Sequence, residues 1–503
     1  MNKQECAAHY DRYASRRDQW KQRNRYYHQT IEQLCQSFIP PGKTVLELGS
    51  STGDLLAAVR PRVGVGVDLS RGMNEIARRK YPEYYFIQAD AEQLPLREKF
   101  DYVIMSDLIG QLSDVWAMFR QLTHVCAPHT QVIITSYNFL WQPVLDAAEK
   151  LKLKMPQQYQ NWLGPADLAT LFHLTNFAVV ESGTRLLVPK QLPAVADWAN
   201  RRLPGSWLDR AALLNYFVVR PAAGIAESAT ETATCSVIVP CRNEAGNIAA
   251  CVERTPAMGA HTELIFVDGA STDGTVAEIE RQIERWQGEK DIKLIHQVPP
   301  GDGRGAASDR AANRMLKLGK GDAVRKGFAA ASGDVLMILD ADLTVPPEDL
   351  PKFFDAISKK KGDFINGTRL VYPLAEQSMK TLNLLGNKFF SQVFTWLLDQ
   401  RIKDTLCGTK ALHQTDYRRI AAARHYFGEF DPFGDFDLLF GAARLGLKIV
   451  EMPVRYQRRT AGESKVRVVS HGILLARMCA IGFWKFKAAP WLSRWLGNER
   501  PLE

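Results

Sequence analysis

The sequence lacks a run of about 18 consecutive apolar residues, the shortest length typical of a membrane-spanning helix. It also has no apolar signal segment after its polar start, and its eight cysteines are scattered without the paired spacing of a metal site. The first absence argues against a membrane span. The other two favour the reducing cytoplasm, which we predict as the compartment of this protein.

What the sequence does have is length: 503 residues, of which 46% are hydrophobic. Single hydrophobic cores stop growing at roughly 250–300 residues, so we expect two or three folded domains rather than disorder. The net charge of +9 indicates an anionic partner. Nucleic acid, phosphorylated substrates and acidic membrane surfaces all meet that description, and the charge does not choose among them.

Residues 221–234 are small and polar and show no apolar period, so we predict a linker there. On both sides of it, short apolar runs alternate with helical patterns, which is typical of parallel α/β layers. The sequence therefore predicts an α/β protein with domains at 1–220 and 235–470. The first 35 residues, rich in Arg, Gln and Tyr, are expected to form lid or capping helices.

The remaining segment, 471–503, is predicted to be amphipathic and to touch a membrane surface. Its apolar part, residues 472–484, is interrupted by Arg477 and is too short to cross a bilayer. Lys485 and Lys487 follow directly, which favours a helix lying at the cytoplasmic face of a membrane. A core helix docked on its own domain is an equally open interpretation.

Four short apolar runs in the first half each lead into a polar turn. The first run, residues 44–48, precedes a turn bounded by Gly49 and Gly53, where backbone can approach a ligand closely. The second run ends one βα unit later in an acid that can accept hydrogen bonds from ribose hydroxyls. The acids at the ends of the four runs are Glu47, Asp68, Asp90 and Asp107.

This ordered set resembles the class I S-adenosylmethionine-dependent methyltransferases over about residues 40–140. The resemblance implies a Rossmann-like fold and S-adenosylmethionine (SAM) as cofactor. One departure is Ser51, which stands where the family usually has a third glycine. By the resemblance, Glu47, Gly49 and Gly53 surround the methionine end of SAM, Asp68 contacts its ribose, and Asp90 and Ala91 contact its adenine.

The sequence identifies no general base for methyl transfer. His124 and His129 are the nearby histidines, and such residues are more often surface or packing groups than bases, so both stay unassigned. Residues 107–110 lack the Asn/Asp-Pro-Pro-aromatic pattern of enzymes that methylate nucleic-acid amines. We therefore predict no nucleic-acid partner.

In the second half, Asp340 and Asp342 follow the apolar run 335–339. A buried parallel strand is thus predicted to end with two carboxylates in the crevice where open α/β sheets bind ligands. Two acids one residue apart can hold a hard divalent cation, which neutralises the phosphates of an activated donor. The pair predicts a site for Mg2+ or Mn2+ and a nucleotide diphosphate.

Two further strands, 237–239 and 264–267, end in polar turns whose carboxylates can accept hydrogen bonds from base and ribose. Residues 319–327 form a basic, glycine-containing segment suited to a diphosphate. The residues that we predict to bind the nucleotide are Pro240, Asn243, Glu244, Asp268, Asp273, Lys320, Arg325 and Asp340.

Together these motifs resemble the inverting family 2 glycosyltransferases with a GT-A fold, from about residue 235 to 467. More narrowly, they resemble the branch related to dolichyl-phosphate mannose synthase. The resemblance implies a nucleotide-diphosphate sugar as donor. It places Glu244 and Asp268 at the nucleoside, Lys320 and Arg325 near the phosphates, and Asp340 and Asp342 at the metal.

The resemblance also implies an acidic residue late in the sequence, on the side that binds the acceptor, and either Asp435 or Asp437 fits it. A sugar hydroxyl as acceptor would need such a base, whereas a phosphate is already ionised and could attack without one. Residues 453–467 concentrate five cations, resemble the polyprenyl-phosphate binding loop of this branch, and precede the apolar segment. A solvated basic surface is the alternative. The predicted phosphate ligands are Arg455, Arg458, Arg459, Ser464 and Lys465.

We therefore predict a bifunctional enzyme. One half transfers a sugar to a polyprenyl phosphate with inversion, and the other methylates a sugar or lipid-linked intermediate with SAM. One alternative is a glycosyltransferase acting on a glycan or protein hydroxyl, joined to a silent methyltransferase-like half. Another is a nucleic-acid methyltransferase with a binding module, which the net charge motivates.

Overall fold

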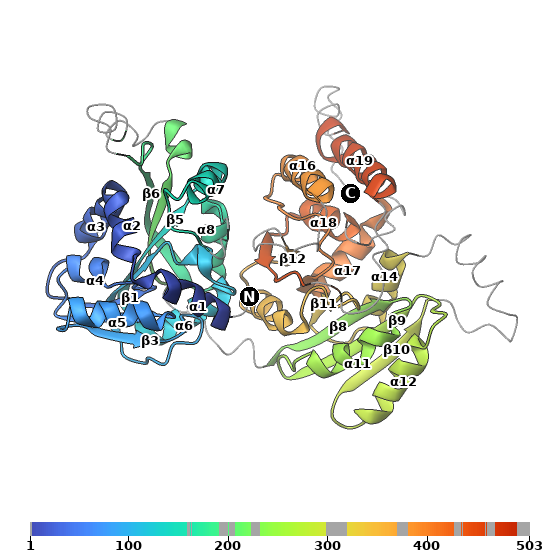
Figure 1. Ribbon diagram of the computed structural model, residues 1–503. Coiled ribbons are helices and arrows are strands. Elements are labelled where there is room, and N and C mark those ends of the chain that lie inside the picture. Colours follow the sequence, from blue (N-terminus) through green and yellow to red (C-terminus); the bar gives the residue numbers. More distant parts are fainter. Residues whose placement is uncertain are drawn as a thin grey trace, which may run out of the picture. The chain divides into compact units, whose positions relative to one another are not determined.

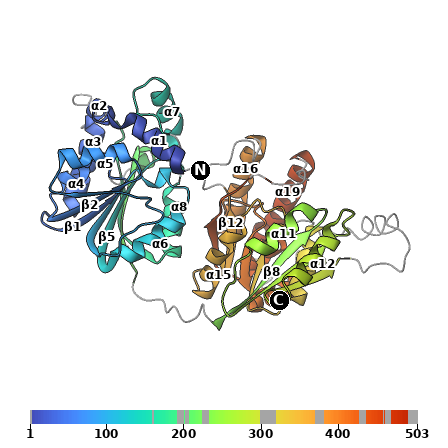
Figure 2. The same ribbon diagram turned by 60° about the horizontal axis from the view of Figure 1, so that its bottom comes forward.

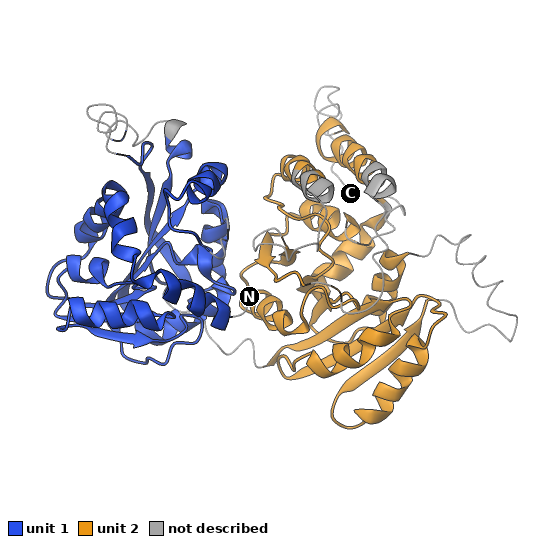
Figure 3. Cartoon of the chain, in the orientation of Figure 1, with its two compact units in different colours: residues 1–224 blue, residues 225–503 orange. Residues whose placement is uncertain are grey.

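The computed structural model describes residues 3–157, 161, 163–190, 200, 207–222, 232–297, 319–369, 381–426, 434, 436–457, 459 and 468–489. The chain divides into two compact units, Met1–Gly224 and Ile225–Glu503 (Figure 3). The boundary falls inside the polar segment 221–234. The eight cysteines are free thiols, and seven of them are buried. Within the described ranges, no helix combines the length and the apolar character that crossing a bilayer requires.

Unit 1 is a seven-stranded sheet in the order β3-β2-β1-β4-β5-β7-β6, covered by helices (Figure 1). Strands β1 to β5 are parallel, and β7 runs antiparallel to both of its neighbours. The strands are β1 (Thr44–Leu48), β2 (Val63–Asp68), β3 (Tyr85–Gln88), β4 (Phe100–Ser106), β5 (Cys126–Tyr137), β6 (Phe177–Arg185) and β7 (Leu214–Pro221).

Three helices precede the first strand of unit 1, where helices were predicted for the first 35 residues. Helix α3 buries one face, Tyr27, Ile31, Leu34 and Cys35, against the sheet. The helices are α1 (Lys3–Ala14), α2 (Arg17–Arg23), α3 (Arg25–Phe38), α4 (Asp54–Ala58), α5 (Arg71–Lys80), α6 (Val115–Val125), α7 (Gln142–Lys150) and α8 (Pro165–Leu174).

Unit 2 holds a second seven-stranded sheet, in the order β10-β9-β8-β11-β13-β12-β14 (Figure 2). All four residues of the short central strand β11 are buried, because parallel strands are covered on both faces. The strands are β8 (Thr234–Cys241), β9 (His261–Asp268), β10 (Asp291–His296), β11 (Val335–Ile338), β12 (Phe364–Thr368), β13 (Lys410–His413) and β14 (Ile449–Pro453).

The helices of unit 2 cover this sheet, and α16 packs against α19. They are α11 (Ala245–Arg254), α12 (Thr275–Arg285), α14 (Lys320–Ala330), α15 (Leu350–Ser358), α16 (Thr381–Leu398), α17 (Gln414–Ala422), α18 (Phe436–Arg444) and α19 (Val468–Phe483), with a π-helical turn at Trp484–Ala488.

The α/β class predicted from the sequence is confirmed in both units. The expectation of purely parallel layers was too simple, because β13 is antiparallel to β11 and β12 just as β7 is in unit 1. In both sheets the carboxyl ends of the first parallel strands still meet at one edge, so the strand-end acids lie where the sequence placed them.

Candidate active sites in the two units

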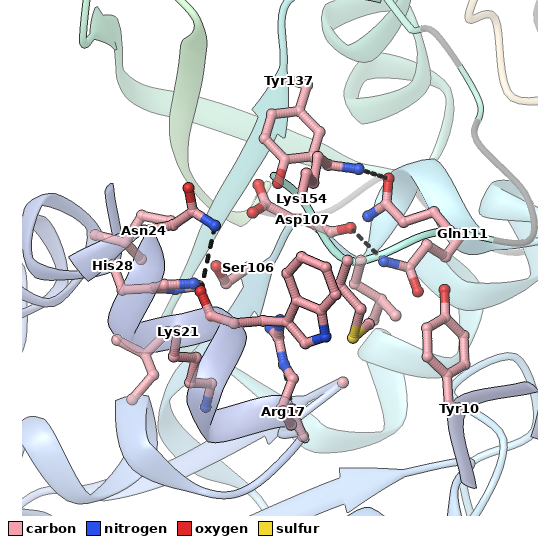
Figure 4. Close-up of a pocket in the computed structure, with 18 of the residues that line it drawn as sticks. Tyr10, Arg17, Lys21, Asn24, His28, Ser106, Asp107, Gln111, Tyr137 and Lys154 are labelled. Carbon is pink, nitrogen blue, oxygen red and sulfur yellow. Dashed lines mark hydrogen bonds between the residues drawn. The ribbon is translucent and has the colours of Figure 1, made fainter. Parts of the chain in front are cut away.

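Unit 1 contains a cavity of about 440 Å³ at the carboxyl ends of β1, β2 and β4. It is closed on the other side by residues of α1, α2, α3 and α7 (Figure 4). Five of the six predicted cofactor residues line it: Glu47, Gly49, Asp68, Asp90 and Ala91. Gly53 does not line the cavity but precedes α4 as its N-cap.

The turn after β1 has a left-handed backbone at three positions: Gly49 (φ +74°), Ser51 (φ +50°) and Gly53 (φ +80°). A Cβ on Gly53 would lie 2.7 Å from the ring of Phe86, so this position needs glycine for space as well as for conformation. Ser51 holds the conformation for which the family uses its third glycine. Its N–H donates to Asp68 Oδ2 at 2.8 Å.

Two acids of this cavity, Glu47 and Asp68, accept hydrogen bonds from backbone N–H groups, whereas Asp90 is also paired with Lys3 Nζ at 3.2 Å. Asp68 accepts from Ser51 and Ser70, both at 2.8 Å, and Glu47 Oε2 accepts from Leu56 N–H at 3.0 Å. Burial raises the pKa of Glu47 to about 8. The Asp68 carboxylate is thus matched to a ligand that brings hydrogen-bond donors, such as hydroxyl groups.

The lid residues were missed by sequence reasoning, which predicted the helices but not their side chains. Tyr10, Arg17, Lys21 and His28 all line the cavity. The aromatic and basic composition of the first 35 residues was the available signal, but nothing in it told which side chains face inward. Burial, with Arg17 and Lys21 close by, lowers the pKa of His28 to about 3, so this imidazole is neutral.

In unit 2, Asp340 and Asp342 follow β11, and each is paired with a cation. Lys320 Nζ lies 2.5 Å from Asp340 Oδ1, and Arg459 Nη2 lies 2.5 Å from Asp342 Oδ2. Asp342 Oδ1 also accepts from the hydroxyl of Thr344 at 2.8 Å. Although burial alone would raise it, the pKa of Asp340 is lowered by Lys320, with Lys410 and Arg369 adding to the effect.

The basic segment 319–327, expected to be a glycine-flexed stretch, forms the start of α14 from Lys320. The start of α14, with Lys320, therefore lies at the same edge of the sheet as Asp340. Gly408 makes this approach possible, since a Cβ there would collide with both Asp340 Oδ2 and Lys320 Nζ. Gly408 is visible in the sequence, but only the structure shows that it is needed for the contact between Asp340 and Lys320.

The predicted nucleoside residues sit at the ends of β8 and β9. Asp268 and Glu244 are almost fully buried, and Glu244 accepts from Asn247 Nδ2 at 2.8 Å. Asn243 and Asp273 hold the two turns together instead: Asn243 Oδ1 accepts from Thr272 N–H, and Asp273 accepts from Ala245 and Thr275 N–H. Pro240 lies in β8 beside Val267 of β9.

On the acceptor side, Asp437 is held by two guanidinium groups: Arg325 Nη1 at 3.3 Å and Arg424 Nε at 3.7 Å. Arg325, expected near the phosphates, thus lies in contact with the acceptor-side acid. Arg455 donates to Asp349 Oδ1 at 2.7 Å. Four predicted residues lie outside the described part of the chain: Asp435, Arg458, Ser464 and Lys465.

Family models match both units. Residues 19–182 match the model described as a methyltransferase domain, and residues 236–316 and 312–419 match the model of glycosyl transferase family 2. The chain joins a methyltransferase domain to a family 2 glycosyltransferase domain. The recognition made from strand-end motifs is confirmed for both halves.

The glycosyltransferase domain has curated relatives. It is 29% identical over 238 residues to the dolichol-phosphate mannosyltransferase of Pyrococcus furiosus, covering 46% of this chain and 59% of that protein. It is 37% identical over 139 residues to the dolichol-phosphate mannosyltransferase of Saccharomyces cerevisiae, covering 27% of this chain and 44% of that protein. The chain therefore spans about half the length of these two relatives.

A third relative is covered more fully. The dolichyl-phosphate hexose transferase of Haloferax volcanii is 28% identical over 232 residues, which covers 46% of this chain and 85% of that protein. All three relatives are named for sugar transfer to dolichol phosphate or dolichyl phosphate.

The donor set of the glycosyltransferase domain fits a divalent cation that is shared with a substrate. Asp340 and Asp342 supply two hard oxygen ligands. Among the described residues, no group of three or more His, Cys, Asp or Glu side chains could enclose a metal ion. Two carboxylates plus substrate phosphates and water is the usual way in which Mg2+ is held.

Proposed function

We propose that the glycosyltransferase domain transfers a sugar, with inversion, from a nucleotide-diphosphate sugar to a polyprenyl phosphate. The observation that carries this proposal is the pairing of strand-end carboxylates with cations at Asp340–Lys320 and Asp342–Arg459. Such a site holds equal numbers of fixed charges of both signs. When a metal ion and an anionic diphosphate bind, the carboxylates can contact the metal ion and the cations can contact the diphosphate.

In this proposal Asp340 and Asp342 hold Mg2+ or Mn2+. Bound there, the ion supplies positive charge to the departing diphosphate. Lys320 and the start of α14 lie at the same edge and stabilise the same negative charge. Asp268 and Glu244 bind the nucleoside through its hydroxyl and N–H donors.

A phosphate acceptor is favoured over a hydroxyl by the surroundings of Asp437. The guanidinium groups of Arg325 and Arg424 already contact this carboxylate, so an acceptor hydroxyl would have to displace one of them to reach it. A hydroxyl acceptor needs a strong base, whereas a phosphate monoester is already ionised near neutral pH. Of the predicted phosphate ligands, Arg455 and Arg459 are described, and each would exchange its carboxylate partner, Asp349 or Asp342, for that phosphate.

Peripheral contact with a membrane is supported by exposed aromatic side chains on α16 and around the end of α19, two helices that lie side by side (Figure 1). These side chains are Phe389, Trp396, Phe483 and Trp484. Trp396 and Trp484 are each 55% exposed, and Trp396 stacks on Phe483 with ring centroids 6.0 Å apart. Exposed aromatic rings next to lysines are typical of surfaces that lie at a bilayer interface.

Two lysines complete this surface. Lys487 Nζ lies 5.6 Å from the centroid of the Trp396 ring and pairs with Asp399, and Lys485 precedes it. Leu475 and Met478 of α19 are buried in the domain core, so the helix packs on one side and presents its aromatic end on the other. The interpretation as a helix docked on its own domain is confirmed for this buried side, and contact with a membrane stays a proposal.

For the methyltransferase domain, we propose that SAM binds in the cavity of unit 1. The left-handed turn at Gly49–Gly53 and the acids Glu47, Asp68 and Asp90 at neighbouring strand ends support this assignment. Bound there, SAM supplies an electrophilic methyl group. The methylated molecule is proposed to be a sugar or a lipid-linked intermediate of the same pathway.

The test of the first activity is a transfer assay. The full chain is incubated with a panel of nucleotide sugars, Mn2+ and a polyprenyl phosphate, and products are identified by mass spectrometry. We expect a polyprenyl-phosphate sugar, no product with excess EDTA, and an anomeric configuration opposite to that of the donor by NMR. Transfer to free glycans but not to the lipid phosphate would overturn the assignment of the acceptor.

The test of the second activity is titration calorimetry with SAM on the full chain. We expect saturable binding in the wild type and its loss in Gly49→Val, because Gly49 is left-handed and a Cβ there would lie 3.1 Å from Leu108 Cδ1. Absence of binding in the wild type would remove this proposal and leave the glycosyltransferase assignment untouched.

A further inference from the structure

Asp107 lies beside the turn proposed to hold the methionine end of SAM. It follows β4, which pairs in parallel with β1 so that Ile104 is level with Glu47. The next residue, Leu108, packs over the turn: a Cβ on Gly49 would lie 3.1 Å from Leu108 Cδ1. Asp107 also lines the same cavity. The reactive end of the cofactor and this carboxylate therefore share one compartment.

The backbone of Asp107 is held in a left-handed conformation, φ +53°. Residues other than glycine adopt this conformation uncommonly, and such positions cluster where a side chain must be aimed. The carboxylate accepts from Tyr27 OH at 2.6 Å and from Thr135 Oγ1 at 3.2 Å. A carboxylate has about four acceptor positions, so two are left for a ligand.

The compartment around Asp107 is bounded by both aromatic and polar side chains (Figure 4). Tyr137 and Lys154 lie next to Asp107 in the close-up, and Trp20 and Trp141 also line the cavity. Aromatic walls with a few placed polar groups suit a compact organic acceptor rather than a polymer backbone. The charged or titratable groups that face Asp107 are Tyr27 of α3, Tyr137 of β5, Arg17 of α2 and Lys154 after α7.

We infer that Asp107 is the catalytic base of the methyltransferase domain and that the methyl acceptor offers it a hydroxyl group. This inference rests on SAM as the methyl donor. The hydroxyl oxygen forms a bond to the methyl carbon as its proton passes to the Asp107 carboxylate. The bond between that carbon and sulfur breaks, and its electron pair stays on the sulfur, which becomes a neutral thioether.

A carboxylate in this position favours a hydroxyl over an amine as the methyl acceptor. A hydroxyl is a poor nucleophile until a base removes its proton in the transition state. A neutral amine needs no such help, and a protonated amine would be held by Asp107 in its unreactive form. Burial raises the pKa of Asp107, which makes its carboxylate a stronger base than that of an exposed aspartate.

The variant that tests this role is Asp107→Asn, because asparagine tolerates a left-handed backbone better than most residues and keeps the side-chain shape. Asp101→Asn is the matched control. It is the same change at the amino end of the same strand, where Asp101 accepts hydrogen bonds from Thr44. SAM affinity measured by calorimetry should stay within about twofold in both variants.

The activity readout compares phenol with aniline, two small probes of the same shape that differ only in the reacting group. With SAM, the wild type and Asp101→Asn should form anisole at a higher rate than N-methylaniline. Asp107→Asn should lose about 100-fold or more of anisole formation, the usual contribution of a general base. Preference for aniline, retention of anisole formation in Asp107→Asn, or no product from SAM-bound enzyme would each overturn the inference.

A second readout needs no methyl transfer. p-Nitrophenol is coloured in its ionised form, so its apparent pKa can be followed by absorbance when it is bound to the S-adenosylhomocysteine complex. An ionised Asp107 should raise that pKa, because it favours the neutral phenol that donates to it, and Asp107→Asn should lower it. Equal values in the two proteins would contradict the proposed contact.

Tyr27→Phe separates a base from a merely structural residue. Loss of the Tyr27 hydroxyl removes a hydrogen bond that favours the ionised carboxylate, so the acid limb of the pH–rate profile should move to higher pH. A structural role for Asp107 would leave that limb in place. Failure of the wild type to bind SAM would instead refute the cofactor proposal, so the two failures are distinguishable.

Discussion

In the methyltransferase domain two strand-end acids, Glu47 and Asp68, accept hydrogen bonds from backbone N–H groups, although Asp90 is paired with Lys3. In the glycosyltransferase domain Asp340 and Asp342 are paired with the side-chain cations Lys320 and Arg459. Both sets lie at the carboxyl ends of parallel strands. The sheet topology fixes where an acid stands, but the partner of that acid indicates the charge of the ligand.

The difference has a simple electrostatic reason. A carboxylate bound by backbone N–H groups, such as Asp68, keeps acceptor positions for a ligand that brings hydrogen-bond donors. A carboxylate already neutralised by lysine or arginine can take a metal ion only by releasing that side chain, which is then available for an anion. Each domain can therefore be tested by altering the partner as well as the acid.

The largest expected effect is that of Asp340→Asn, which removes one of only two acidic metal ligands proposed for the glycosyltransferase domain. We expect sugar transfer to fall by about 10³-fold or more, because charge stabilisation of the leaving group is lost. The measurement is the glycolipid assay. Asp334→Asn, at the amino end of the same strand, is the matched control, since Asp334 contacts Thr234 outside the site.

A smaller effect is expected from removing the partner. In Lys320→Met, the ammonium that neutralises Asp340 is absent, so nucleotide-free protein should bind Mn2+ about tenfold more tightly, as seen by electron paramagnetic resonance. Lys326→Met, on the same helix but paired with Asp322, should leave Mn2+ binding unchanged. An unchanged affinity in Lys320→Met would show that Lys320 does not compete with the metal.

Glu47 of the methyltransferase domain should change the free energy of unfolding with pH in the opposite sense to a salt-bridged acid. Burial raises the pKa of Glu47 from 4.5 to about 8, so between these values the folded state holds a proton that the unfolded state has lost. The free energy of unfolding should therefore fall as pH rises through this window, by up to about 1.4 kcal/mol per pH unit.

Glu47→Gln should flatten that dependence, because the amide does not titrate. Hydrogen exchange of the β1 and β2 amides, corrected for the intrinsic rate at each pH, reports the stability of this domain alone. The wild type should lose protection between about pH 5 and pH 8 relative to the variant. Parallel curves for the two proteins would mean that Glu47 is ionised in the folded state.

Much of this arrangement could be predicted from the sequence, because its signals lie in residues that are close together in the chain. Apolar runs ending in acids gave the strands and the positions of Asp68 and Asp340, and the order of those motifs gave the two families. A strand-end acid needs only its own neighbours in sequence to be recognised.

The partners of these acids could not be predicted in the same way. Lys320 meets Asp340 because α14 packs beside β8 and β9, and Arg325 meets Asp437 across more than 100 residues of chain. The direction of Asp107 toward Tyr27 depends on a left-handed backbone and on how α3 docks. Contacts set by tertiary packing leave no periodic signal in a single sequence.

The smallest effect concerns the residue at which this chain departs from its family. Ser51→Gly should relieve a left-handed backbone that costs serine about 1–2 kcal/mol, while glycine adds about 0.5–1 kcal/mol of unfolded-state entropy. The net expectation is a gain of about 0.5 kcal/mol in the stability of the methyltransferase domain, measured by hydrogen exchange.

The same variant tests what the serine side chain contributes. Ser51 Oγ accepts from Arg17 Nε at 3.1 Å and so ties α2 to the turn that is proposed to hold SAM. If that contact positions the lid, Ser51→Gly should weaken SAM binding even as the fold becomes more stable. Weaker binding with higher stability would mark Ser51 as a functional departure from the family. An equal or tighter binding would show that the turn binds its ligand through its backbone alone, as the N–H contacts of Asp68 suggest.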